Sequence, residues 1–133
     1  MTILFVCKAN VGRSQMAESI FNRLSKKYRA FSAGTDVGSN EGKPLHELVI
    51  GCMTEQGYDL SNNKRKQLTA EMVQAADKII VMTEKKDLPL YLKDLPNAIF
   101  WSVDNPKDKS YEFHCATIDQ IKKLVETLVK EIG

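Results

Sequence analysis

The sequence predicts an α/β fold in which a four-stranded parallel sheet is doubly wound, with helices on both faces. Apolar segments typical of strands alternate with amphipathic segments typical of helices along the chain. The first apolar segment, residues 2–7, lacks polar alternation, as in a strand buried on both faces. Parallel strands need crossover connections, and the intervening helices supply them. We therefore expect ligands to bind beyond the carboxyl ends of the strands.

In the first half of the chain, the pattern changes from strand to helix and back. Apolar residues recur at three- and four-residue steps from 14 to about 27, which predicts an amphipathic helix. Pro44 suits the first turn of a second helix, and Gly57 suits its end. The predicted elements of this half are a strand at 2–7, a helix at 14–27, a strand at 29–33, a loop at 34–43 and a helix at 44–56.

The second half repeats the alternation. Thr69 is a typical N-cap for a short helix that ends near Ala75, and residues 77–82 end in the apolar run of a buried strand. A single apolar stripe marks the last helix. The predicted elements of this half are a polar loop at 61–67, a helix at 69–75, a strand at 77–82, a helix at 83–93, a strand at 98–103, a polar loop at 104–112 and a helix at 116–132.

Length and composition narrow the class of protein. The chain has 133 residues, 43% of them hydrophobic, which predicts one domain over residues 1–133. A formal net charge of +2, with scattered basic residues, argues against a nucleic-acid partner. The apolar runs are far shorter than the roughly 20 residues that cross a bilayer, so no membrane partner is expected. Three cysteines without a close pair in the sequence fit a reducing, cytoplasmic location.

The segment between the first strand and the first helix has the features of an anion site. Its backbone N–H groups would converge at a helix N-terminus, where an anion is favoured. The same donors favour a thiolate at Cys7, the form that attacks phosphorus. Arg13 can fold back and grip two phosphoryl oxygens with its planar guanidinium. The candidate phosphate-binding residues are Lys8, Ala9, Asn10, Val11, Gly12, Arg13 and Ser14.

The polar side chains of this loop have separate expected roles. The Ser14 hydroxyl can donate to the thiolate, and the amide of Asn10 can hold the backbone in a strained conformation. The alternative for Cys7 is an inert thiol buried at a strand end, but that alternative leaves Arg13 and Ser14 unexplained. Lys8 is not a Walker A lysine, because the Gly-Lys-Ser/Thr ending is missing.

Five groups of segments, in order along the chain, match a known family: 5–14 with 16–18, then 32–35, then 59–61 with 65–68, then 81–83, and finally 104–106. On these segments the chain resembles the low-molecular-weight protein-tyrosine phosphatases and the arsenate reductases that share their fold. The resemblance covers most of the chain and implies a four-stranded parallel sheet, a cysteinyl-phosphate intermediate on Cys7, phosphate binding by Arg13 and loop support by Asn10 and Ser14. It predicts a phosphomonoester hydrolase that acts on a phosphorylated protein or a small aryl phosphate, with no cofactor.

The catalytic acid departs from the family pattern. Cleaving a phosphomonoester requires a proton for the leaving oxygen, which one carboxylic acid can supply. In the family this acid is the Asp immediately before a Pro, whereas here Asn105 precedes Pro106. We predict that Asp104 takes the role through a small shift of the loop, with Asp108 as the other carboxylate nearby. The alternatives are a turn or cap role for Asp104 and an oxyanion-binding protein with impaired turnover.

Aromatic residues at the site are a second departure. Family members that act on phosphotyrosine usually have aromatic side chains beside the phosphate loop, including one after the Asp-Pro pair, where this chain has Lys107. Tyr111 or Phe113 can supply an aromatic ring, or both can pack at the base of the last helix. Val11 resembles the branched aliphatic residue of tyrosine-specific members, which favours an aryl phosphate.

An arsenate reductase is the alternative function, because Gln15 resembles the reductase version of this helix start. A thioredoxin-coupled reductase relays oxidation through cysteines on the loop after the third strand, where this chain has Met82 and no thiol. Cys52 and Cys115 are interpreted as packing residues. A reductase would therefore need an external thiol to resolve a Cys7–arsenic adduct.

The remaining candidates have simpler interpretations. No His, Cys or carboxylate spacing is typical of a metal site, so no metal is expected. His46 and His114 are interpreted as surface or cap residues. The basic run 64–66 is interpreted as a solvated loop, or as a guide for an anionic substrate. Trp101 is interpreted as a core residue rather than a substrate platform.

Overall fold

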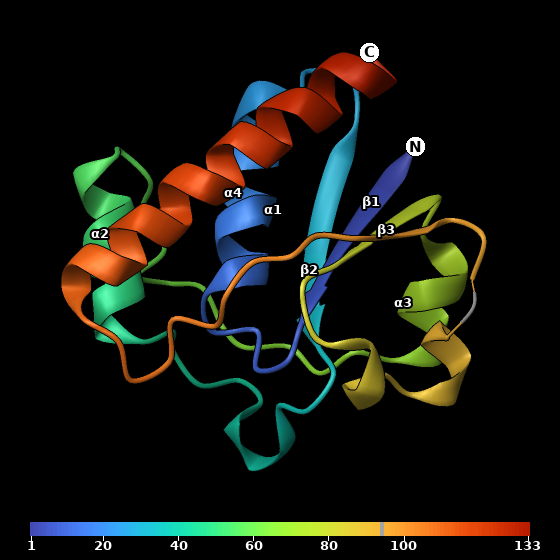
Figure 1. Cartoon of the computed structure of the whole chain (residues 1–133), viewed down its shortest axis with the longest axis horizontal. Coiled ribbons are helices and arrows are strands. Elements are labelled where there is room, and N and C mark those ends of the chain that lie inside the picture. The colour runs from blue at the N-terminus through green and yellow to red at the C-terminus, as the bar shows by residue number, and fades with distance from the viewer. Residues whose placement is uncertain (94) are drawn as a thin grey trace.

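The sheet has the predicted parallel arrangement. The computed structural model describes residues 1–93 and 95–133. Its strands lie side by side in the order β2-β1-β3-β4, and every neighbouring pair is parallel (Figure 1). The strands are β1 (Thr2–Cys7), β2 (Arg29–Gly34), β3 (Lys78–Val81) and β4 (Ala98–Phe100).

Helices cover both faces of this sheet, as predicted. Three of them pack on one face: α1 (Arg13–Leu24), α2 (Glu47–Glu55) and α4 (Tyr111–Ile132) (Figure 1). The other face carries α3 (Ala70–Ala75) and two 3₁₀ turns, η2 (Lys85–Asp87) and η3 (Leu90–Leu92), and a further turn, η1 (Gly38–Asn40), lies in the loop after β2. None of the helices in the described residues is long and apolar enough to cross a membrane.

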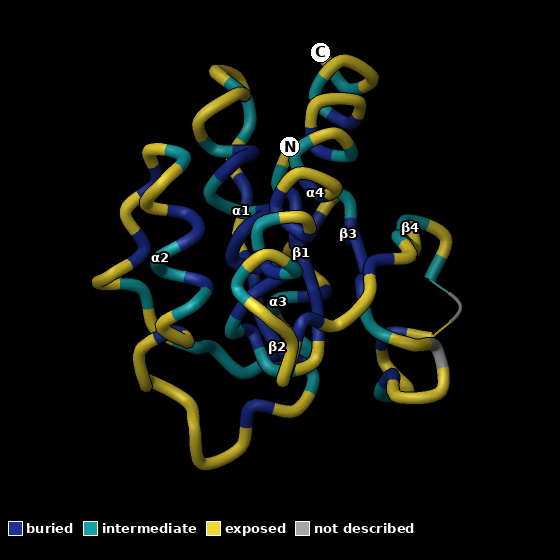
Figure 2. The backbone as a smooth tube through the Cα atoms, turned by 60° about the vertical axis from the view of Figure 1, so that its left-hand side comes forward, coloured by how far each residue is buried: buried dark blue, intermediate teal, exposed yellow. Residues whose placement is uncertain are grey.

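The strand β1 separates two hydrophobic cores. Ile3, Phe5 and Cys7 belong to the larger core under α1, α2 and α4, while Leu4 and Val6 belong to the smaller core under α3. Figure 2 shows the buried residues gathered around β1, with exposed loops outside. Because both faces of the strand are covered, its side chains need no polar alternation. Complete burial of a side chain such as Phe5 contributes about 1.5–3 kcal/mol to stability.

The predicted helix at 83–93 is wrong. The structure has the two short turns η2 and η3 in this segment, with Pro89 between them. A proline lacks the backbone N–H that a helix needs and collides with the preceding turn. The predicted strand at 98–103 is also too long, since β4 ends at Phe100. The carbonyl of Val103 instead accepts a hydrogen bond from the Arg13 side chain.

Two helix starts also differ from the prediction, because side chains cap them at other positions. α4 begins at Tyr111, five residues before the predicted start, where the Ser110 hydroxyl accepts from the backbone N–H of Phe113 at 3.2 Å. α2 begins at Glu47, where the His46 ring accepts from the backbone of Leu48. Thr69 caps α3 as predicted.

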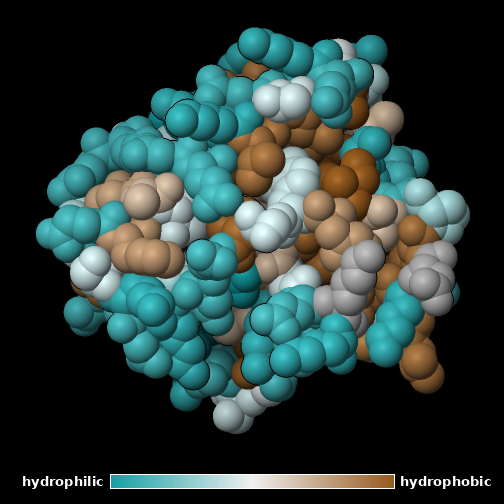
Figure 3. Space-filling view, viewed as in Figure 1, coloured by the Kyte–Doolittle hydropathy of each residue, from teal (hydrophilic) through white to brown (hydrophobic). Residues whose placement is uncertain are grey.

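The carboxyl ends of the parallel strands meet at one edge of the sheet, and in Figure 1 the arrows of β1 and β2 point down toward it. The loops that follow β1 and β2 lie there, and the Arg13 side chain reaches the backbone just after β3 and β4. In the space-filling view, hydrophilic side chains surround this lower part of the molecule (Figure 3). The fold therefore gathers the segments that the sequence singled out.

Candidate active site

The loop between β1 and α1 is held by the end of β2. The backbone N–H groups of Thr35 and Asp36 donate to the carbonyls of Cys7 and Lys8, each at 2.9 Å. This close approach requires Gly34, because a Cβ atom there would lie 2.6 Å from the Lys8 carbonyl oxygen. Two neighbouring strand ends thus fix the backbone of the loop.

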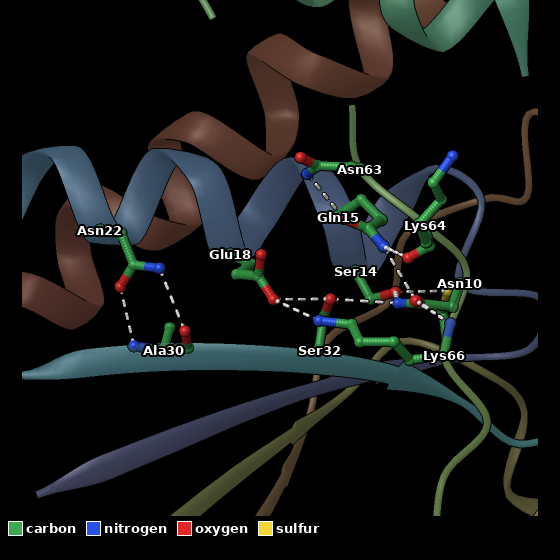
Figure 4. A network of polar contacts seen from close by, with 11 residues as sticks. Asn10, Ser14, Gln15, Glu18, Asn22, Ala30, Ser32, Asn63, Lys64 and Lys66 are labelled. Carbon is green, nitrogen blue, oxygen red and sulfur yellow. Dashed lines mark hydrogen bonds and ion pairs between the residues drawn. The ribbon is translucent and has the colours of Figure 1, made fainter. Parts of the chain in front are cut away.

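Asn10 pins the centre of the loop in a left-handed conformation, with φ 53°. Its side chain is completely buried. The amide nitrogen donates to the hydroxyls of Ser14 at 2.7 Å and Ser32 at 3.1 Å. The amide oxygen accepts from Gln15 at 2.8 Å and from the backbone N–H of Lys66 at 2.9 Å (Figure 4). These hydrogen bonds compensate for a backbone conformation that non-glycine residues rarely adopt.

A second layer of polar residues supports Asn10. Gln15 donates to the carbonyl of Lys64 at 3.0 Å and accepts from Asn63 at 3.1 Å. Glu18 accepts from the Ser32 hydroxyl at 2.9 Å and forms an ion pair with Lys66 at 3.1 Å (Figure 4). The basic run 64–66 is therefore not simply a solvated loop, since its backbone and Lys66 belong to this network. The sequence did not predict the support of Asn10 by Gln15 or the ion pair of Glu18 with Lys66. The one signal was Gln15 itself, which resembles the reductase version of this helix start.

Cys7 lies next to Ser14. Its sulfur is 3.0 Å from the Ser14 hydroxyl, and both residues are buried. Because Asn10 donates to the Ser14 oxygen, the hydroxyl proton of Ser14 is free to point at the sulfur. A donated hydrogen bond stabilises a thiolate relative to a thiol. Among the predicted loop residues, Asn10 and Ser14 therefore lie behind the nucleophile rather than at the surface of the site.

Arg13 folds over the loop as predicted. Its guanidinium is largely buried, and Nη1 donates to the carbonyl of Met82 and to that of Val103 at 2.9 Å. These carbonyls follow β3 and β4, so the sheet fixes the orientation of the side chain. Within the described residues, Nε and Nη2 make no hydrogen bond, which leaves two donors in a fork for an anion.

A pocket of about 300 Å³ opens beside Cys7. Arg13 lines it, and so do Ala9, Val11 and Gly12 of the same loop. Lys8 instead faces a neighbouring hollow of about 530 Å³, which shares only Arg13 and Asn105 with this pocket. The remaining lining comes from the loops and helix ends around the site: Asn40, His46, Val49, Arg65, Asn105, Pro106, Lys107, Asp108 and His114.

The two candidate acids lie in different hollows. Asp108 lines the pocket that contains Cys7, whereas Asp104 lines the neighbouring hollow. The side-chain oxygen of Asn105 accepts from the backbone N–H of Lys107 at 3.1 Å, so Asn105 shapes the turn. Asp108 has φ 61°. The role of Asp104 as the catalytic acid stays a prediction. Asp108 is the aspartate that lines the same pocket as Cys7.

Neither candidate aromatic residue lines the Cys7 pocket. The ring of Tyr111 packs over Gly51 of α2. A hydrogen bond between the Tyr111 hydroxyl and Glu55 is the main reason why the pKa of Tyr111 lies well above its ordinary value. Phe113 lies beneath the Lys109 ammonium group, 5.8 Å from the ring centre. Trp101 packs against Phe5, which agrees with a core role.

Two histidines form an unpredicted wall of the pocket. The rings of His46 and His114 stack with centroids 5.9 Å apart and planes 16° apart, and both line the pocket. His46 is a cap residue as expected, but the interpretation of His114 as a surface or cap residue is wrong. It is 4% exposed, and its Nδ1 lies 2.8 Å from the Ser110 carbonyl. The residues are 68 positions apart, and no local sequence pattern indicates the stack.

The family follows from comparison with known proteins. The family model for low molecular weight phosphotyrosine protein phosphatase matches residues 2–133. The chain belongs to this family. The resemblance seen in the sequence is therefore confirmed.

In the described residues there is no group of His, Cys, Asp and Glu that could hold a metal ion.

Relatives of both activities cover nearly the whole chain. The probable low molecular weight protein-tyrosine-phosphatase EpsP of Ralstonia solanacearum is 27% identical, over 98% of this chain and 95% of its own. Arsenate reductase 1 of Staphylococcus epidermidis is 29% identical, over 98% of this chain and 97% of its own. The protein is thus an enzyme of this family, a phosphatase or an arsenate reductase.

Solved structures agree with the fold. The low molecular weight protein tyrosine phosphatase from T. tengcongensis has a TM-score of 0.88 and 27% identity, covering 98% of this chain and 99% of that chain. An arsenate reductase in the phosphate binding state has a TM-score of 0.81 and 27% identity, covering 99% of this chain and 98% of that chain. The same fold therefore carries both activities.

Proposed function

We propose that the protein is a phosphomonoester hydrolase that works through a cysteinyl-phosphate on Cys7. One observation carries the proposal: Cys7 and Arg13 line the same pocket, with the Ser14 hydroxyl 3.0 Å from the sulfur. The nucleophile, its stabilising donor and the phosphate-binding guanidinium thus occupy one rigid loop. This is the minimum arrangement for attack of a thiolate on a bound phosphoryl group.

The reaction has two steps on this loop. The loop amides and the Arg13 guanidinium bind the phosphoryl oxygens, the Cys7 sulfur forms a bond to phosphorus, and the bond to the leaving oxygen breaks. A carboxylic acid protonates that oxygen, and the resulting carboxylate then takes a proton from the water that hydrolyses the S–P bond. Inorganic phosphate leaves, and Cys7 returns to the thiolate.

The acid is Asp108 in this proposal, because Asp108 lines the Cys7 pocket and Asp104 does not. Asp104, the residue chosen from the sequence, is the competing assignment. Both side chains are exposed, and they are four residues apart on one loop, so a matched pair of variants separates them.

The proposed substrate is an aryl phosphate, either on a protein or as a small molecule. Beyond the phosphate loop, the pocket offers Val11 and the stacked rings of His46 and His114 as flat or apolar surfaces. Such surfaces suit an aromatic leaving group. The similarity to the probable tyrosine phosphatase EpsP supports this class of substrate.

Arsenate reduction with an external thiol is the second candidate. Two observations support it. Gln15, which resembles the reductase version of this helix start, donates a hydrogen bond to Asn10 of the phosphate loop. The chain is also similar to arsenate reductase 1. The loop after β3 begins at Met82 and contains no cysteine. A reductase would therefore pass the Cys7–arsenic adduct to a small thiol such as glutathione.

A single set of assays separates these functions. Wild type and Cys7→Ser are assayed with para-nitrophenyl phosphate and, in parallel, with arsenate and glutathione. We expect phosphate release that Cys7→Ser abolishes while inorganic phosphate still binds. Arsenite formation that depends on thiol and Cys7, without phosphate release, would instead establish the reductase. Phosphate binding with neither reaction would identify an oxyanion-binding relative and contradict the proposal.

A further inference from the structure

Two cysteines outside the Cys7 site lie against each other. Cys52 is on α2 and Cys115 is near the start of α4, and their sulfur atoms are 2.9 Å apart. Both thiols are free in this structure. A disulfide bond is about 2.05 Å long, so a movement of less than about 1 Å brings the sulfurs to bonding distance. The two residues are far apart in the sequence, which therefore gave no sign of the pair.

We propose that Cys52 and Cys115 form a reversible disulfide that joins α2 to α4. The bond is a covalent modification site separate from the chemistry of Cys7, and it does not depend on the proposed function. Its immediate requirement, two sulfurs held in contact by packed helices, is met in the folded chain. Simple packing does not require two thiols at this distance, since any small apolar pair fills such a space.

The different burial of the two thiols sets the order of the reaction. Cys115 is partly exposed, whereas Cys52 is completely buried. Burial, and then the hydrogen bond with Cys115, raise the pKa of the Cys52 thiol to about 12. Cys52 is therefore protonated near neutral pH and shielded from solutes. An oxidant in solution therefore reacts first with the Cys115 thiol, and the buried Cys52 thiol reacts second.

The proposed oxidant is a small-molecule disulfide such as glutathione disulfide. The Cys115 sulfur attacks one sulfur of this molecule, which breaks its S–S bond and releases the first small thiol. The Cys52 sulfur then attacks the Cys115 sulfur of the mixed disulfide, which forms the internal bond and releases the second small thiol. The two cysteines lose two electrons, and their two protons end on the released thiols.

The bond ties together two elements of the active site. His46, at the start of α2, and Val49, one turn before Cys52, line the Cys7 pocket, and so does His114, the neighbour of Cys115. The disulfide also closes a long loop of the chain, which lowers the entropy of the unfolded state. We therefore expect oxidation to raise the melting temperature by roughly 10 °C.

The test uses Cys7→Ser protein, so that neither the nucleophile nor its activity affects the result. The folded protein is incubated with excess glutathione disulfide at mildly alkaline pH. It is then unfolded in denaturant in the presence of an alkylating agent, which labels every free thiol, and its mass is measured by mass spectrometry. We expect a species that lacks two hydrogens, takes up no alkylating group and reverts with dithiothreitol. Tryptic peptide 110–122 should be linked to the peptide that contains Cys52, and the melting temperature should rise.

The matched control is the double variant Cys7→Ser, Cys115→Ser, in which Cys52 should remain a free thiol under the same oxidant. Circular dichroism confirms that each variant is folded. A stable mixed disulfide on Cys115 with Cys52 still alkylated would overturn the proposal. So would a linkage between two chains only, or an unchanged mass in folded protein.

Discussion

The loop 7–14 and the loop 104–110 line the same pocket but are supported in different ways. Each contains one non-glycine residue in the left-handed region, Asn10 with φ 53° and Asp108 with φ 61°. Asn10 is completely buried and hydrogen-bonded to Ser14, Ser32, Gln15 and the backbone of Lys66. Asp108 is exposed, and its side chain makes no hydrogen bond or ion pair within the described residues.

This difference suggests a division of labour. Binding a phosphoryl group requires donors held rigidly before the substrate arrives, because preorganised dipoles cost nothing at the moment of reaction. A proton donor must instead exchange protons with water and reach the leaving oxygen. A carboxylate without fixed partners suits that second task. We therefore expect variants of the first loop to reduce turnover of every substrate, and variants of the second loop to depend on the leaving group.

After the loss of activity in Cys7→Ser, the largest effect is expected from Arg13→Lys in the rigid loop. An ammonium group replaces a fork of donors with one point charge and loses the geometry of the hydrogen bonds to the Met82 and Val103 carbonyls. We expect kcat/KM for para-nitrophenyl phosphate to fall by about 10³-fold. Arg65→Lys is the matched control, because Arg65 lines the same pocket but its Nε is held by the Pro44 carbonyl. Equal losses in both variants would contradict a special role for Arg13.

A leaving-group series tests the second loop. We expect Asp108→Asn to slow hydrolysis of aryl phosphates with poor leaving groups by about 10²-fold, since general acid catalysis contributes on that scale. Good leaving groups need little proton transfer and should be affected much less. The matched variant is Asp104→Asn, four residues away in the neighbouring hollow. If Asp104→Asn shows the dependence and Asp108→Asn does not, the acid is Asp104, as the sequence predicted.

The sequence was most informative where the site is contiguous. The strand β1, the loop after it and the start of α1 are continuous in the chain, so their pattern predicted the positions of Cys7 and Arg13. The predicted helix at 83–93 is wrong because Pro89 interrupts the segment, which forms the two short turns η2 and η3 instead. The early start of α4 was not predicted, because Ser110 and the residues around it show no apolar pattern that marks the beginning of a helix.

Contacts between distant residues could not be predicted from one sequence. The ion pair of Glu18 with Lys66 joins positions 48 residues apart, and the Cys52–Cys115 pair joins positions 63 residues apart. Each is set by how helices and loops pack, and no local pattern records that packing. The acid was uncertain for another reason: Asn105 broke the motif, and only the folded loop shows which aspartate shares a pocket with Cys7.

Substitution of Asn10 should have the smallest effect on rate and also tests the comparison directly. Asn10→Ala removes the side-chain hydrogen bonds and leaves a residue that adopts the left-handed conformation less readily than asparagine, so we expect a loss of about 2–4 kcal/mol in unfolding free energy. Turnover should fall roughly tenfold, because Ser14 loses the donor that orients its hydroxyl toward Cys7.

Asn10→Gly separates the two causes of this loss, since glycine tolerates φ 53° without strain but also lacks the amide. Denaturant unfolding should therefore show Asn10→Gly to be more stable than Asn10→Ala by about 1 kcal/mol. The two variants should have equal rates, because both lack the amide group. Asn10→Gly with wild-type turnover would mean that the backbone alone orients Ser14. Asp108→Gly should leave stability within about 0.5 kcal/mol of wild type, because no side-chain partner is lost.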